Sequence, residues 1–134
     1  MEFPRRKPDA PAGTTRAAGD AAEDRALAHL LGRGLKLLAR NYRTPGRGGG
    51  EIDLVMREAG GTLVFVEVRQ RASGAFGGAA ASIGGTKQRR IVFAARHFLL
   101  RFAAPPPCRF DVVSVQAGRL EWLRGAFEAD QGLR

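Results

Sequence analysis

Residues 50–71 constrain the fold more than any other stretch of this chain. Residues 51–56 alternate acidic and apolar side chains, and residues 62–69 are rich in β-branched and aromatic side chains, so both segments are typical of strands. The pair Gly60-Gly61 between them predicts a tight turn, because glycine adopts a positive φ without steric cost. The sequence therefore predicts a β-hairpin.

This hairpin brings two carboxylates together. If it closes symmetrically about Gly60, Asp53 lies opposite Glu67, and Glu51 lies opposite Arg69. Like charges that face each other at roughly 5 Å destabilise a pair of strands. A divalent cation would reverse the effect, because Mg²⁺ binds one or two carboxylates together with waters and phosphate oxygens. The alternative is a shifted register, with each carboxylate solvated at an end of the sheet.

The segments on either side of the hairpin predict a layered α/β domain. Residues 20–33 and 86–102 have apolar side chains at helical spacing, and further strands are expected at 35–42, 109–115 and 120–124. The side chains expected to be buried on the helices are Ala22, Ala26, Leu27, Leu30 and Leu31, then Ile91, Ala94, Ala95, Phe98 and Phe102. The central strand is apolar on both faces, which predicts helices on both sides of the sheet and an α/β/α sandwich of three layers in the order α-β-β-β-α-β-β.

Length, charge and cysteine content limit the class of protein. With 134 residues the chain is expected to form one domain at 19–128, between a disordered basic arm at 1–18 and a flexible tail at 129–134. The formal net charge of +9 favours an anionic partner, either nucleic acid or an acidic membrane surface. The single cysteine excludes an internal disulfide. The absence of a transmembrane-length apolar run and of a secretory signal leads us to expect a cytoplasmic protein.

Glu23 has two interpretations. With Asp20 it has the spacing of a capping box at the start of the first helix. It also lies beside the apolar stripe that contains Leu27 and Leu30, from where an acid could reach a cation on the sheet. The helix alone does not decide between a cap and a ligand.

Residues 44–50 form a glycine-rich segment between the first two expected strands. They lack the lysine-serine pair of a P-loop, so a flexible connector is favoured over a phosphate cradle. Glycine in this segment would also permit the close approach of another part of the backbone.

Basic residues gather at the start of the second helix, for which Thr86 is the expected N-cap. Lys87, Arg89 and Arg90 lie in its first turns, where the helix dipole disfavours each cation by about 0.3–1 kcal/mol. A phosphate backbone would offset this cost, because it interacts with the side chains and with the N–H groups of the helix end. The alternative is a solvated run of charge that salt screens. Further positive charge on neighbouring segments comes from Arg43, Arg47 and Arg71.

Four motifs carry a resemblance to a known family. They are Gly50-Glu51-Ile52-Asp53-Leu54, Phe65-Val66-Glu67-Val68-Arg69, Thr86-Lys87-Gln88 and Arg109-Phe110-Asp111-Val112-Val113. In this order they resemble the YraN family, small bacterial proteins of unassigned function, over about residues 19–127. The family lies within the restriction-endonuclease-like PD-(D/E)xK superfamily, which includes archaeal Holliday-junction resolvases. The resemblance implies a restriction-endonuclease-like sandwich with a mixed central sheet.

The resemblance also implies an active site. Glu23, Asp53, Glu67 and Arg69 occupy its four positions, and the backbone carbonyl of Val68 would join Asp53 and Glu67 in binding Mg²⁺ or Mn²⁺. Arg69 stands where the superfamily usually has lysine, and arginine can clamp a phosphate but cannot act as a base at physiological pH. The residues expected to contact nucleic acid are Arg43, Arg47, Arg71, Lys87, Gln88, Arg89 and Arg90. Asp111 is expected to form hydrogen bonds at the end of the sheet rather than to catalyse.

The sequence and this resemblance together predict a metal-dependent nuclease, a phosphodiesterase that acts on DNA in preference to RNA. Branched repair or recombination intermediates are candidate substrates. The alternative is a non-catalytic nucleic-acid-binding protein in which the acidic site has become a phosphate clasp. A membrane-surface adaptor is disfavoured, because no expected helix combines a basic face with exposed large apolar side chains. A homodimer is left open.

Overall fold

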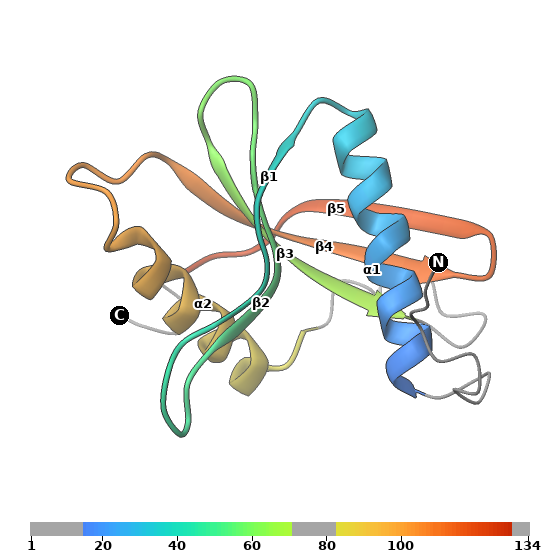
Figure 1. The fold of residues 1–134 in the computed structure, drawn as a ribbon, viewed down its shortest axis with the longest axis horizontal. Coiled ribbons are helices and arrows are strands. Elements are labelled where there is room, and N and C mark those ends of the chain that lie inside the picture. The colour runs from blue at the N-terminus through green and yellow to red at the C-terminus, as the bar shows by residue number, and fades with distance from the viewer. Residues whose placement is uncertain (1–14, 71–82, 130–134) are drawn as a thin grey trace, which may run out of the picture.

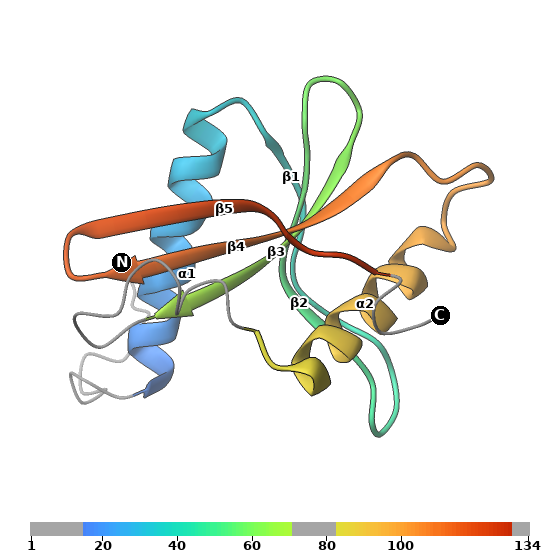
Figure 2. The same ribbon diagram turned by 180° about the vertical axis from the view of Figure 1, so that it is seen from behind.

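Two helices lie on opposite faces of one twisted sheet (Figures 1 and 2). The structure, a computed structural model, describes residues 15–70 and 83–129. The elements along the described chain are α1 (Thr15–Gly32), β1 (Lys36–Arg43), β2 (Glu51–Arg57), β3 (Leu63–Gln70), α2 (Gly85–Leu99), β4 (Cys108–Gln116) and β5 (Arg119–Phe127). This is the predicted order. The parts of the expected N-terminal arm and C-terminal tail at 1–14 and 130–134 lie outside the described residues.

The sheet has the strand order β1-β2-β3-β4-β5 and is mixed, as the resemblance implies. Neighbouring strands are antiparallel except β3 and β4, which are parallel and are joined through a connection that includes α2. A parallel pair needs such a crossover, because its second strand begins again at the same edge of the sheet. The strands twist so strongly that β1 and β2 run across the direction of β4 and β5 (Figure 1).

The hairpin of β2 and β3 has the predicted register. Leu54 pairs with Val66, Val55 with Phe65 and Met56 with Val64, as symmetric closure about Gly60 requires. The shifted register is therefore wrong. The physical reason is that each strand buries apolar side chains on both faces. A slip of one residue would move every side chain of a strand to the other face, out of the packing that it has there.

Two apolar clusters on opposite faces of the sheet form the core, and each includes one helix. On the α1 face, Ala22, Ala26 and Leu30 pack with apolar side chains of the hairpin such as Leu54 and Val66. On the α2 face, Ile91 and Phe98 pack with side chains such as Phe65 and Phe110. The predicted three-layer arrangement is confirmed. Neither helix has the length and apolar character needed to cross a bilayer.

Three sequence-based expectations about the helices are wrong. Helix α1 begins at Thr15, so Asp20 lies inside it and cannot be its N-cap. Helix α2 has Gly84 as its N-cap, because the Gly84 carbonyl accepts a hydrogen bond from Gln88 N–H at 2.9 Å, and Thr86 lies within the helix. Leu31 is 47 % exposed, because it lies about 100° around the helix from the buried Leu30 and so faces away from the sheet.

The fourth motif has the structural role expected of Asp111. This carboxylate is fully buried and accepts hydrogen bonds from Arg109 Nε, Trp122 Nε1 and the Gly125 N–H, each at 2.9 Å. Arg109 also pairs with Glu58 in the hairpin turn at 2.7 Å. The network therefore ties β4 and β5 to the turn between β2 and β3, away from the acidic pair.

Candidate active site

The candidate site lies where the pairing of β2 and β3 gives way to a side-chain contact. The paired residues of this ladder run from Arg57 with Leu63 to Leu54 with Val66. One residue further along β2, Asp53 Oδ2 accepts a hydrogen bond from the Val68 N–H at 2.8 Å. A side-chain oxygen here binds an N–H of the neighbouring strand, so the Asp53 carboxylate is held against the backbone of β3.

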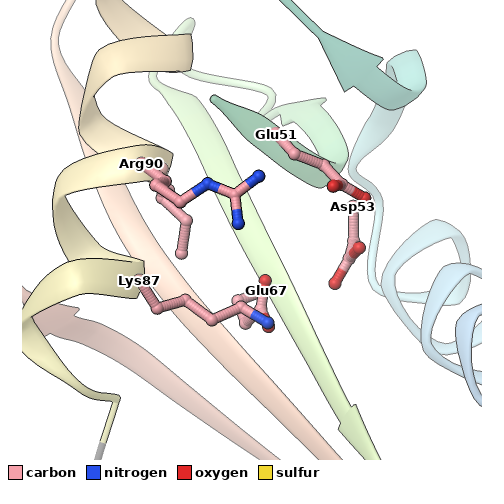
Figure 3. A pocket seen from close by; sticks show the side chains of 6 residues that line it. Glu51, Asp53, Glu67, Lys87 and Arg90 are labelled. Carbon is pink, nitrogen blue, oxygen red and sulfur yellow. The ribbon is translucent and has the colours of Figure 1, made fainter. Parts of the chain in front are cut away.

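A small pocket of about 60 Å³ opens beside this contact. It is lined by Glu51, Asp53, Glu67, Lys87, Arg90 and Ile91. Figure 3 shows the three acids on the sheet strands and the two bases on α2, with their charged ends turned toward one another. The pocket thus joins an acidic strand pair to a basic helix start.

Asp53 and Glu67 form a closely coupled carboxyl pair. The Glu67 side chain is only 7 % exposed, and it forms a hydrogen bond with the Asp53 carboxyl. Burial first, and then the charge of Glu67, raises the pKa of Asp53 to about 7, while the Val68 N–H and the charge of Lys87 oppose the rise. Without a further cation, the pair therefore retains a proton at pH values where an ordinary aspartate is ionised.

Lys87 supplies the nearest positive charge to this pair. Its Nζ lies 2.9 Å from Glu67 Oε2, and the hydrogen bond to Glu67 raises the pKa of the ammonium. The lysine side chain is 59 % exposed, so its charged end lies between the buried glutamate and solvent. Lys87 is predicted from the sequence to contact phosphate, and in the structure it also forms this ion pair inside the pocket.

Glu23 approaches the pair from α1, on the other side of the sheet. Its side chain is 14 % exposed, and burial followed by the charge of Asp53 raises its pKa. Arg40 on β1 offsets this: its Nε lies 3.3 Å from Glu23 Oε1 and its Nη2 lies 2.8 Å from Asp24. Three of the four predicted active-site residues, Glu23, Asp53 and Glu67, therefore interact electrostatically through the central Asp53.

Arg69 is the fourth predicted position. It lies two residues after Glu67 on β3 and is half-buried, beside Ser114 of β4 in the strand register. It is not among the side chains that line the pocket, where the cations are Lys87 and Arg90.

The predicted nucleic-acid-binding residues have varied surroundings. Arg90 lines the pocket, and its Nε donates to the Gly49 carbonyl at 3.3 Å. Arg43 lies 3.7 Å from Glu51 across β1 and β2. Gln88 Nε2 donates to the Ile83 carbonyl at 2.8 Å and so fixes the backbone that leads into α2. Arg47 and Arg89 are exposed, as are the other described cations of this set, and Arg71 lies outside the described residues.

The donor set fits a divalent cation that keeps waters in its coordination shell. Within residues 15–70 and 83–129, no three Asp, Glu, His or Cys side chains form a complete ligand set. Asp53 and Glu67 nevertheless provide two adjoining carboxyl groups, the number that Mg²⁺ usually takes from a protein. Burial, and then the charge of Glu67, raises the pKa of Asp53, and a bound cation would relieve both effects because it stabilises the ionised carboxylates.

Sequence reasoning missed two contacts of the site. Arg40 lies next to apolar residues of its strand, but nothing in the sequence indicated that it pairs with Glu23. The pairing of Lys87 with Glu67 had a signal in the unusual cations at the start of α2. In both cases the partner lies on an element distant in sequence, which only the packing brings near.

Fold and site together define a class: a small α/β/α protein with a mixed sheet, whose central hairpin presents coupled carboxyl groups to a basic helix. The chain belongs to the family described as "Uncharacterised protein family UPF0102", whose model matches residues 22–115. This is the YraN family that the four motifs resemble.

Bacterial relatives support the same membership. A UPF0102 protein of Acidovorax sp. (strain JS42) is 72 % identical over 120 residues, which cover 90 % of this chain and 91 % of the relative. A UPF0102 protein of Paracidovorax citrulli is 72 % identical over 116 residues, covering 87 % and 86 %. A third, from Albidiferax ferrireducens, is 68 % identical over 117 residues, covering 87 % and 91 %.

Proposed function

We propose that this protein is a metal-dependent nuclease that hydrolyses phosphodiester bonds of DNA, with branched DNA as a candidate substrate. The observation that carries the proposal is the buried Asp53–Glu67 carboxyl pair, which faces two cations of α2 across an open pocket. A stable fold gains little from two adjoining buried acids, because each raises the free energy of the other's ionised form. Such conflicts between stability and local chemistry are expected at functional sites.

Each residue has a role in this proposal. Asp53 and Glu67, with the Val68 carbonyl, would hold Mg²⁺ or Mn²⁺. The cation would supply Lewis acidity, which lowers the pKa of a water and screens the phosphate charge. Glu23 would orient the attacking water, and Arg69 would stabilise the negative charge that develops on the phosphate. Hydrolysis forms a bond from the water oxygen to phosphorus and breaks a phosphorus–ester oxygen bond. The proton lost by water passes to solvent, and the leaving oxygen takes one from solvent.

The charge of the chain supports a polyanionic substrate. The formal net charge is +9, and basic side chains on β1, α2 and the segment between β1 and β2 lie close to the pocket in sequence or in space. Sequence-independent binding to DNA depends mainly on such phosphate contacts.

A non-catalytic phosphate clasp is the second candidate. The Lys87–Glu67 ion pair favours it, because it already neutralises one carboxylate of the pair without a metal. The arginine at position 69 favours it as well, since this residue remains charged and cannot accept a proton. In this case nucleic acid binds but is not cut.

A cleavage assay separates the two. Linear, flapped and four-way DNA are incubated with the protein in Mg²⁺, in Mn²⁺ and in EDTA, alongside Asp53→Asn and the control Glu128→Gln, an exposed acid outside the pocket. We expect nicking that requires the metal, falls at least about 100-fold in Asp53→Asn and is kept in Glu128→Gln. Binding without nicking of any substrate, at high protein and Mn²⁺ concentrations, would overturn the nuclease and leave the clasp.

A further inference from the structure

The lysine in the pocket has a second side that faces solvent. Lys87 Nζ contacts Glu67 Oε2 at 2.9 Å, yet the lysine side chain is 59 % exposed whereas the glutamate is 7 % exposed. An ammonium group has three N–H donors and no acceptor. The solvent-facing part of the ammonium can therefore donate to an anion that approaches from the mouth of the pocket.

Helix α2 holds this lysine at a defined place. Gly50 packs against the backbone of α2 so closely that a Cβ there would lie 2.1 Å from the Arg90 carbonyl oxygen. Arg90 Nε binds the Gly49 carbonyl, and Gln88 Nε2 binds the Ile83 carbonyl just before the helix. The first turn of α2 is thus fixed to the segment that leads into β2, and Lys87 is directed at the carboxyl pair (Figure 3).

The other cations are less suited to act inside the pocket. Arg90 lines it, but its Nε donates to the Gly49 carbonyl. Arg69 does not line the pocket. Lys87 lines the pocket and also forms an ion pair with Glu67 of the Asp53–Glu67 pair.

We propose that Lys87, supplied by α2 and not by the strand that carries Glu67, is a further residue that contacts the reacting phosphate, in addition to Arg69. Glu67 holds the ammonium while the site is free of metal. When Asp53 and Glu67 hold a divalent cation, Glu67 would no longer pair with Lys87, and the ammonium would be available to the phosphate. This inference rests on the proposed function, because the phosphate that Lys87 contacts is cleaved only if the protein is a nuclease. The contact itself is measured by DNA binding.

The coupling between metal and Lys87 provides the test. Fluorescence anisotropy measures the affinity for a labelled DNA duplex in EDTA and in Ca²⁺, a cation chosen to occupy the site without supporting cleavage. The variants are Lys87→Met and, as a matched control, Arg89→Met, which removes an exposed cation of the same turn that does not line the pocket.

We expect Lys87→Met to weaken binding about tenfold in Ca²⁺ and less than about twofold in EDTA, because Glu67 already holds the lysine when metal is absent. Arg89→Met should weaken binding by the same factor in both. A partial recovery in Ca²⁺ by Lys87→Arg would show that the positive charge is what matters. Thermal melting of each variant confirms that it is folded.

The outcomes are separable from those of the nuclease proposal. If Lys87→Met weakens binding equally in EDTA and Ca²⁺, Lys87 is an ordinary backbone contact and the inference is overturned, even where wild type nicks DNA. If the coupling is present and wild type does not nick, the nuclease fails, and Lys87 is a phosphate contact of a metal-dependent clasp.

Discussion

At the scale of single residues, Asp53 is the group on which the site depends. Its carboxyl accepts the Val68 N–H, forms a hydrogen bond with Glu67 and raises the pKa of Glu23 by its charge. One side chain thus connects both faces of the sheet. The arrangement lowers the free energy of unfolding when the acids are ionised. This loss of stability can be measured without a substrate.

The stability of the protein should depend on pH through Asp53. The folded protein keeps a proton on Asp53 up to its pKa of about 7, whereas an unfolded chain releases it near the ordinary value of 3.8. The contribution of this group to stability is therefore complete below about pH 4 and is lost as the pH rises toward 7, because unfolding then releases a proton. Asp53→Asn should remove this loss and raise the free energy of unfolding at pH 8 by about 1–2 kcal/mol.

Urea unfolding in EDTA between pH 4 and pH 8 measures the effect, with Glu128→Gln as the control. The control should follow the wild-type pH profile, since its side chain is exposed and outside the pocket. A wild-type slope retained in Asp53→Asn would mean that another group binds the proton.

At the scale of elements, the glycine-rich segment at 44–50 joins β1 to β2 and packs against α2. Its ends are joined, because Gly50 N–H donates to Thr44 Oγ1 at 2.7 Å and Thr44 N–H donates to the Gly50 carbonyl at 3.1 Å. The close approach of another backbone, which the sequence predicted for this segment, occurs at Gly50, where α2 is the neighbour. The lack of a side chain there sets the distance between the basic helix and the acidic strands.

A single methyl group should disturb this contact. In Gly50→Ala the new Cβ would lie 2.1 Å from the Arg90 carbonyl oxygen and 2.8 Å from the Ala94 nitrogen, both backbone atoms of a helix that cannot move alone. We expect a loss of about 2–3 kcal/mol in the free energy of unfolding and weaker DNA binding, since α2 would shift outward. The control is Gly60→Ala in the hairpin turn, where a Cβ meets no atom within 4 Å. Equal stability of the two variants would contradict the close packing.

At the scale of the whole molecule, positive charge determines which partners approach. The net charge of +9 produces attraction for any polyanion, and salt weakens this attraction because DNA binding releases counterions. The position of the charges decides whether the bound DNA meets the pocket. Arg89 and Arg90 lie in the first turns of α2, and Arg90 lines the pocket, so DNA bound by this pair would lie near it.

Salt titration tests this placement. The logarithm of the binding constant should fall linearly with the logarithm of salt concentration, with a slope of about −0.9 for each neutralised phosphate. Replacing Arg89 and Arg90 by alanine together should make the slope shallower by up to about two units. The pair Arg119 and Arg124 on β5 offers a control of equal charge. If the control changes the slope as much as the α2 pair does, DNA binds without a preferred face.

The sequence by itself determined the hairpin, its register and the layers around it. The alternation in 51–56, the Gly60-Gly61 turn and the apolar faces of 62–69 are local, and each narrows the strand pairing. Periodicity also placed the buried stripes of both helices, apart from Leu31. The Asp53–Glu67 pair followed directly from the register, because opposed residues in a hairpin are set by its turn.

Only the tertiary structure decided which charges meet. Lys87 reaches Glu67 and Arg40 reaches Glu23 because the docking of each helix on the sheet brings together residues 17–20 positions apart in the chain. The start of α1 at Thr15, which removed the cap expected at Asp20, likewise has no strong local signal. The periodicity of apolar residues indicates which side of a helix or strand is buried. It does not indicate the angle at which a helix crosses the sheet, or how far along the sheet it lies. Those depend on packing contacts such as that of Gly50 with α2, and they decide the chemistry of the pocket.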